Sequence, residues 1–310
     1  MKVGYIGLGT MGGPMAFNLL KAKHEVFVHD LSKKIAEKHI SQGAIWADSP
    51  AELARQCEVV FTSLPGPTEM ESVALGNSGL INGFSSGDCY FDLTTNSPTT
   101  VRRVHDKMSQ KGVHVFDAPV SGGPKGAQSG KMSLWVGGDE ALFNENKAVL
   151  DAIGDRAMYV GPIGAGAIAK LVHNCSGYMM QTVFAEVFTM GTKAGLDPMA
   201  LWLAVRQGAA GRRRTFDNIP DHFLSNKYDP PAFALKLAHK DVTLATELGK
   251  ELGVPMRIAN LTLAEMTEAR NRGWDERDSR SAMLLQSERA GVEIEVPQEV
   301  IDAAFEKEPK

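Results

Sequence analysis

Short apolar runs alternate with segments of helical pattern up to about Gly161, and beyond it the pattern is helical. The runs are rich in Val, Ile, Phe and Tyr and several end in small or turn residues, which favours strands. Strands that alternate with helices predict a parallel sheet with helices on both faces. We expect these strands at KVGYIG, EVFVHD, EVVFTSL, CYFDLT, VHVFDAP, KMSLWVGG and AMYVG.

The change of pattern at GPIGAG, residues 161–166, is the expected domain boundary, and 310 residues are enough for about two domains. We therefore predict an α/β fold with a doubly wound parallel sheet of the Rossmann type at 1–162. An all-α domain is expected at 163–310, beginning with a long interdomain helix. Its expected helices cover 164–194, 197–208, 232–253 and 257–271.

A glycine-rich turn follows the first expected strand and opens the first expected helix. Its GxGxxG pattern lets the backbone approach a pyrophosphate, whose charge faces the helix N-terminus. The turn therefore predicts that 1–162 binds a dinucleotide, which leaves 163–310 for substrate binding and oligomerisation. The residues of the turn are Gly7, Leu8, Gly9, Thr10, Met11 and Gly12.

The second expected strand ends at Asp30, 18 residues after Gly12. A carboxylate at this place accepts hydrogen bonds from the ribose hydroxyls and repels a 2′-phosphate, which favours NAD over NADP. Lys33 and Lys34 follow it and are able to attract that phosphate, so NADP stays open as an alternative.

Three other strand ends carry groups suited to a ligand, because ligands of such sheets bind at the carboxyl ends of the strands. Leu64 and Pro65 are expected to close over the nicotinamide side of the cofactor. Consecutive glycines after a serine free their amides to face an anion. Ordinary turn chemistry explains the same residues equally well. The remaining strand-end residues are Thr94, Thr95, Ser121, Gly122 and Gly123.

The helix expected from Gly164 is apolar on most sides, yet it contains Lys170. Lys170 and Asn174 lie four residues apart, on one stripe of the helix. Lysine is rarely buried without a reason, although it can also extend its ammonium to water. A helix this apolar predicts assembly into a homodimer or homotetramer, because a small domain does not cover it alone.

The overall composition excludes several classes of protein. A net charge of −4 does not favour nucleic acid or a membrane surface as a partner. No apolar run approaches the ~18 residues of a membrane span, and no cleavage site of a signal peptide follows the N-terminus. The cysteines, Cys57, Cys89 and Cys175, form no CxxC pattern, so we expect reduced thiols, a cytoplasmic location and no metal site.

Four segments together resemble the β-hydroxyacid dehydrogenases, a family that includes 3-hydroxyisobutyrate dehydrogenase and tartronate semialdehyde reductase. The segments are GYIGLGTMGGPMAFNLL, DAPVSGGPKGAQSGKMSLWVGG, GAGAIAKLVHN and FALKLAHKDVTLA, and the resemblance covers nearly the whole chain in order. It implies transfer of a hydride between a nicotinamide cofactor, NAD or NADP, and a small hydroxy acid or its semialdehyde.

The resemblance also implies roles for individual residues. The family's general acid/base lysine matches Lys170, and its assisting asparagine matches Asn174. The residues that match its substrate anchor are Ser121, Gly122 and Gly123, and those that match its cofactor contacts include Thr95 and Lys240.

Two departures from the family pattern bear on the substrate. His173 stands where many relatives have asparagine, and Arg212, Arg213 and Arg214 form a heavier basic run than expected. One of these arginines either grips a second anionic group of the substrate or lies in a solvated or subunit-contact patch. Two alternatives to the main interpretation are an imine reductase-like protein and a non-catalytic NAD(P)-binding relative. Lys170 argues against the first, because imine reductases usually lack this lysine.

Overall fold

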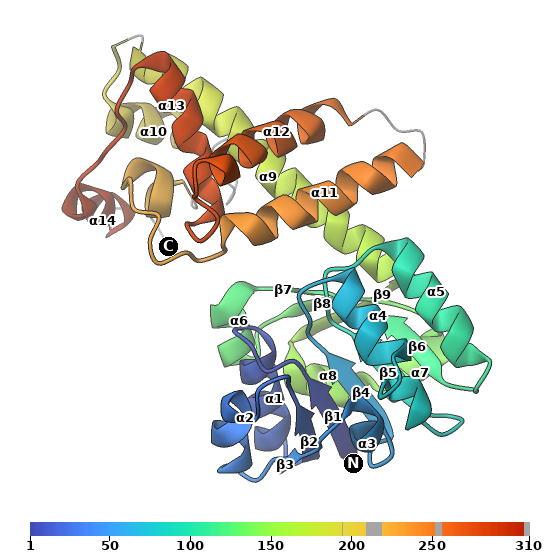
Figure 1. Cartoon of the computed structure of the whole chain (residues 1–310). Helices are drawn as coiled ribbons and strands as arrows, with labels where there is room; N and C mark the ends of the chain where they lie inside the picture. The colour runs from blue at the N-terminus through green and yellow to red at the C-terminus, as the bar shows by residue number, and fades with distance from the viewer. Residues whose placement is uncertain (194, 209–218, 252–255, 307–310) are drawn as a thin grey trace. The chain divides into compact units, whose positions relative to one another are not determined.

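The structure, a computed structural model, describes residues 1–193, 195–208, 219–251 and 256–306. The chain forms two compact units, Met1–Val172 and His173–Lys310 (Figure 1). The long helix α9 (Ala165–Lys193) is continuous across the division between them. The boundary at 162/163 therefore stays a prediction about where the dinucleotide-binding part of the chain ends.

The first unit, blue to green in Figure 1, is built on one nine-stranded sheet in the order β3-β2-β1-β4-β5-β6-β8-β7, with β9 paired to β8. The six strands β1 to β6 pair in parallel, which confirms the predicted doubly wound sheet. The strands are β1 (Lys2–Ile6), β2 (Glu25–His29), β3 (Ile45–Trp46), β4 (Val59–Thr62), β5 (Cys89–Asp92), β6 (His114–Asp117), β7 (Val120–Ser121), β8 (Ser133–Gly137) and β9 (Arg156–Gly161).

Two features of the sheet differ from the prediction. The two-residue strands β3 and β7 were not expected, because two residues show no alternation. Strand β8 runs antiparallel to β6 and β7, and β9 pairs in parallel with β8, so β8 and β9 both run opposite to β1 to β6, whereas parallel strands were expected. Only residues 122–132 connect β7 to β8, fewer than the dozen or more that a parallel crossover needs.

Helices cover both faces of this sheet. One face packs against α1, α2 and α6 to α8, and the other against α3 to α5 and the short helix η1. The bounds are α1 (Gly12–Lys21), α2 (Lys33–Ile40), α3 (Pro50–Ala54), α4 (Pro67–Leu75), η1 (Leu80–Asn82), α5 (Pro98–Ser109), α6 (Gly123–Ser129), α7 (Glu140–Glu145) and α8 (Lys147–Ile153).

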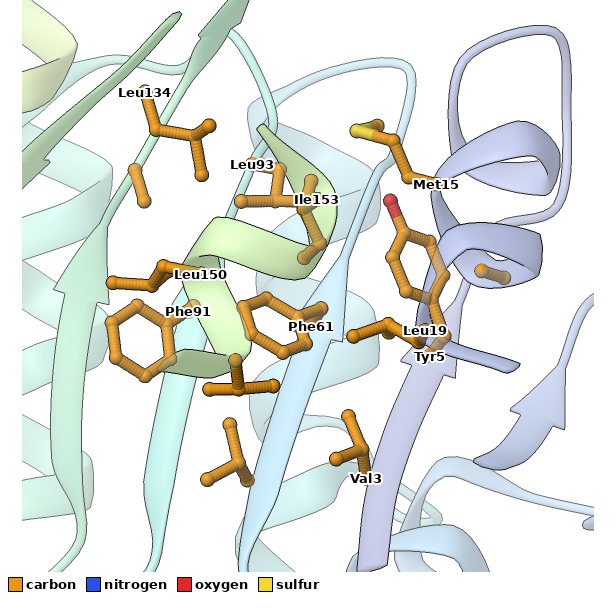
Figure 2. Packing of buried hydrophobic residues seen from close by; sticks show 14 of the residues in the cluster. Val3, Tyr5, Met15, Leu19, Phe61, Phe91, Leu93, Leu134, Leu150 and Ile153 are labelled. Carbon is orange, nitrogen blue, oxygen red and sulfur yellow. The ribbon is translucent and has the colours of Figure 1, made fainter. Parts of the chain in front are cut away.

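A row of aromatic rings runs across the centre of one face of the sheet. Tyr5, Phe61, Phe91 and Phe116 occupy paired positions on β1, β4, β5 and β6, with neighbouring ring centroids 6.3, 5.3 and 4.3 Å apart. Figure 2 shows Tyr5, Phe61 and Phe91 beneath side chains of α1 and α8. These rings are fully buried and fix the sheet against its helices.

The described residues of the second unit form helices joined by loops, and their one β-contact is an isolated bridge between Ala234 and Asp278, which confirms the predicted all-α part. None of the described helices combines the length and the apolar character that crossing a membrane requires. Arg212, Arg213 and Arg214 lie outside the described residues. Beyond α9, the helices are α10 (Pro198–Gln207), η3 (Pro220–Leu224), α11 (Leu235–Glu251), α12 (Arg257–Asn271), η4 (Ser279–Met283), α13 (Leu284–Ala290) and α14 (Gln298–Glu306).

Candidate active site

The glycine turn joins β1 to α1 more tightly than any other residue type allows. Gly7 has φ +91° and donates its N–H to the carbonyl of His29 at 3.0 Å. A Cβ on Gly12 would lie 1.9 Å from the Gly7 carbonyl oxygen, whereas a Cβ on Gly9 would meet nothing within 4 Å. Gly7 and Gly12 therefore allow the backbone segments of the turn to pack against each other. A Cβ at Gly9 would point into open space, which suits a pyrophosphate.

Asp30 ties the glycine turn to the end of β2. Its Oδ2 accepts the N–H of Leu8 at 2.8 Å, and its Oδ1 accepts the N–H of Ser32 at 3.2 Å. A carboxylate has about four acceptor positions, so two further hydrogen bonds from ribose hydroxyls are compatible with this arrangement. The Lys33 ammonium lies 5.5 Å from the centre of the Trp46 ring. This arrangement is compatible with a dinucleotide, and the contacts of these residues with it stay a prediction.

A buried carboxylate organises the ends of β4 and β5. Asp92 is fully buried and accepts hydrogen bonds from Thr62 Oγ1 (2.8 Å), Asn96 Nδ2 (2.9 Å) and the Thr94 N–H (3.2 Å). Burial raises the pKa of Asp92, and these donors oppose that rise. Thr94 Oγ1 in turn accepts the N–H of Leu64 at 3.0 Å, so the loops after the two strands are held together.

The Ser-Gly-Gly segment lies at the junction of β7 and α6. Gly122 has φ +144° and Gly123 has φ +60°, conformations that side chains rarely allow. A Cβ on Gly122 would lie 2.7 Å from Met132 Sδ, whereas Gly123 has open space around it. The half-buried Ser121 pairs with Ser133 on β8. A Cβ direction free of protein atoms at Gly123 leaves room for a ligand beside this segment.

The helix that carries Lys170 begins against the end of β6. Asp117, 1% exposed, accepts the N–H of Gly164 at 2.7 Å and the N–H of Ala167 at 2.6 Å. Lys170 follows Ala167 by three residues and is half-buried. The lysine thus stands one turn beyond a helix start that is bonded to the sheet.

Asn174, one turn further along α9, belongs to a second group of polar residues, with two residues of α11. Its Nδ2 donates to Asp241 Oδ2 at 2.5 Å, and the Lys240 ammonium lies 3.0 Å from Asp241 Oδ1. Asp241 is 1% exposed and Lys240 28%. The contact of Lys240 with the cofactor stays a prediction, as do the roles of Pro65 and Thr95 in the loops after β4 and β5.

Sequence reasoning missed three carboxylates: Asp92, Asp117 and Asp241. Asp92 and Asp117 end neighbouring parallel strands, where an aspartate also serves as an ordinary turn residue. Asp241 directly follows Lys240 in the KD pair. Asp92 and Asp117 could have been noticed in the sequence as acidic residues at the ends of apolar strands, in FDLT and FDAP.

The parallel sheet and its glycine turn define a dinucleotide-binding protein of the Rossmann type. Residues 2–161 match the family model of the NAD binding domain of 6-phosphogluconate dehydrogenase. Residues 164–286 match the model described as NAD-binding of NADP-dependent 3-hydroxyisobutyrate dehydrogenase. The chain belongs to the β-hydroxyacid dehydrogenase family of oxidoreductases, which confirms the resemblance of its sequence motifs.

Its relatives match most of its length. It is 32% identical to 2-(hydroxymethyl)glutarate dehydrogenase of Eubacterium barkeri over 95% of this chain and 97% of that protein. It is 37% identical to 3-hydroxyisobutyrate dehydrogenase of Pseudomonas aeruginosa over 78% of this chain and 83% of that protein. The structure of Mycobacterium tuberculosis 3-hydroxyisobutyrate dehydrogenase with L-serine matches 92% of this chain and 98% of its own, with 26% identity and a TM-score of 0.83.

Proposed function

We propose that the protein is an NAD-dependent β-hydroxyacid dehydrogenase that interconverts a small hydroxy acid and its semialdehyde. The observation that carries this proposal is Lys170, half-buried one turn beyond the anchored start of α9, in a member of this family. Related enzymes bear the names 3-hydroxyisobutyrate dehydrogenase and 2-hydroxy-3-oxopropionate reductase, both of which denote this chemistry.

Lys170 is proposed as the general acid/base. When bound, the nicotinamide accepts or returns the hydride of the carbinol carbon. The neutral amine of Lys170 takes the hydroxyl proton during oxidation, and its ammonium returns a proton to the nascent alkoxide during reduction.

Asn174 is proposed to assist Lys170 without adding a charge. Asp241 is an acceptor, so the amide of Asn174 must turn its Nδ2 toward that carboxylate. Its Oδ1 consequently points to the other side, as an acceptor for the lysine ammonium or the substrate hydroxyl. Asp241 thereby fixes which atom of Asn174 serves the reaction.

The remaining contacts follow from the strand ends. Ser121, Gly122 and Gly123 are proposed to bind the substrate carboxylate. The glycine turn and Asp30 are proposed to hold the adenosine half and pyrophosphate of NAD, since Asp30 presents a carboxylate where NADP carries its phosphate. The nicotinamide half is assigned to Leu64, Pro65, Thr95 and Lys240.

Lys170→Met tests the proposal, because it removes the titrating amine and keeps an apolar stem. We expect kcat to fall at least a hundredfold, within the usual range for general acid–base catalysis, while NAD affinity changes less than twofold. Asn174→Ala should lower kcat less, and the double variant should lose less than the product of both effects.

The substrate for these measurements is chosen from a panel of two- to five-carbon hydroxy acids, tested with NAD and NADP. Lys107→Met, at an exposed position of α5, is the matched control and should retain wild-type kcat. Retention of more than a tenth of wild-type kcat by Lys170→Met contradicts the proposed role of the lysine.

A further inference from the structure

The first turn of α9 takes its cap from a distant strand. The first amides of a helix have no partner within it, and a side chain just before the helix usually accepts one of them. Gly164 stands at that place and has no side chain. The Asp117 carboxylate supplies the missing acceptor from the end of β6, with Oδ1 on the Gly164 N–H and Oδ2 on the Ala167 N–H.

The backbone packs closely around this carboxylate. A Cβ on Gly166 would lie 2.2 Å from the Trp135 carbonyl oxygen, and a Cβ on Gly137 would lie 2.5 Å from Asp117 Oδ1. On the other side, Arg102 Nε donates to the carbonyl oxygen of Ile163 at 3.4 Å. The start of α9 is thus held by hydrogen bonds on two sides.

We propose that Asp117 is a positioning residue for Lys170: by accepting both amides it fixes the first turn of α9 and hence the place of the lysine amine. Lys170 lies three residues beyond Ala167, so a shift of the first turn moves the amine with it. A displacement of about 1 Å in an active site costs as much as a hundredfold in rate. The proposal rests on the acid/base role of Lys170 and adds to it the group that places the amine.

Ionisation of the buried Asp117 carboxylate lowers the stability of the folded protein. Burial raises its pKa to about 6, the carboxylate of Asp92 adds to the rise, and the amides of Ala167 and Gly164 oppose it. The groups around it are Asp92, at the paired position of β5, and Arg102, whose guanidinium bonds to the Ile163 carbonyl next to Gly164. Between pH ~4 and ~6 the folded protein keeps a proton that the unfolded chain has released, so stability falls as pH rises through this window.

The ionised carboxylate accepts both amides, whereas protonation turns one oxygen into a donor. Above pH ~6 the carboxylate is ionised and accepts both amides, so the cap is complete.

The test uses the full-length protein in the direction of semialdehyde reduction. In that direction Lys170 must carry a proton, so its own titration lowers kcat on the alkaline side. A fall of kcat on the acid side that Asp117→Asn abolishes reports Asp117, because Asp92, whose pKa burial also raises, is intact in that variant.

Asp117→Asn keeps the shape but leaves one of the two amides without an acceptor. We expect kcat to fall at least tenfold at pH 7, dinucleotide Kd to change less than twofold and the acid-side fall to disappear. Its melting temperature at pH 7 should not be lower than that of the wild type, because loss of a buried charge offsets loss of one hydrogen bond. A kcat within twofold of wild type, or an unchanged acid-side fall, overturns the proposal.

Two controls distinguish failure of the positioning role of Asp117 from failure of the acid/base role of Lys170. Asp139→Asn makes the same substitution at an ordinary cap, where the carboxylate accepts a single side-chain-capped amide, the Leu142 N–H at the start of α7, and it should leave kcat unchanged. If Lys170→Met remains active, the acid/base role itself fails. If Lys170→Met is inactive and Asp117→Asn behaves as wild type, only the positioning role fails.

Discussion

Two alanine substitutions in the glycine turn should have opposite effects on stability and on binding. In Gly12→Ala the new methyl would lie 1.9 Å from the Gly7 carbonyl oxygen and 3.0 Å from Tyr5 Cε1. An ordinary contact needs about 3.4 Å, so α1 must move away from β1 by about 1.5 Å. In Gly9→Ala the methyl meets no protein atom within 4 Å.

The loss of stability in Gly12→Ala depends on how far the Gly7 carbonyl can move away from the new methyl. Overpacking a core costs about 1–3 kcal/mol, and a backbone carbonyl cannot rotate away as a side chain does, so we take about 3 kcal/mol for Gly12→Ala. The better helix propensity of alanine returns up to about 1 kcal/mol. The net loss of about 2 kcal/mol lowers the melting temperature of a unit of this size by about 4–8 °C.

The assay combines thermal unfolding followed by circular dichroism, without dinucleotide, and NAD binding followed by protein fluorescence. Gly12→Ala should show the lower melting temperature. Gly9→Ala should melt no lower than wild type but bind NAD at least tenfold more weakly, a loss of about 1.4 kcal/mol, because its methyl occupies the space assigned to the pyrophosphate. Wild-type NAD affinity in Gly9→Ala, or wild-type melting in Gly12→Ala, refutes this reasoning.

Two further predictions concern cofactor choice and assembly. NAD should be preferred over NADP in kcat/KM, and Asp30→Ser should narrow that preference because it removes the carboxylate beside the ribose; a tenfold preference of the wild type for NADP, about 1.4 kcal/mol, is the contrary result. Helix α9 exposes Val172, Met180 and Val183 at 61%, 38% and 46%, so a second copy of the chain is expected to cover this apolar face. Light scattering at micromolar concentration should give a dimer or tetramer, and a monomer would contradict the expectation.

The sequence was sufficient for the features that depend on local pattern. Alternating apolar runs located the long strands, and glycine spacing located the turn, because both signals lie within a few residues. The orientation of β8 was not accessible, since a run of apolar residues has the same pattern in either direction. The strands β3 and β7 are too short to show any period.

The missed carboxylates share a different cause. Asp92, Asp117 and Asp241 bond to residues that lie up to 67 positions away in the chain, as Asn174 does from Asp241. Asp30 was selected from the sequence because its proposed partner is the cofactor, yet its bond to the Leu8 N–H was not foreseen. Sequence pattern thus indicated which residues suit a ligand, but not which residues hold them.

The course of α9 has a practical consequence for building hybrid enzymes. Lys170 belongs to the first compact unit and Asn174 to the second, although a single turn of helix separates them. A chimaera joined at the division of the two units, between Val172 and His173, would take the lysine from one parent and the asparagine from the other. A crossover at Pro162, ahead of the helix, would instead inherit both from one parent, but it would then separate Lys170 from Asp117. A hybrid of this family therefore needs a crossover chosen with all three residues in view.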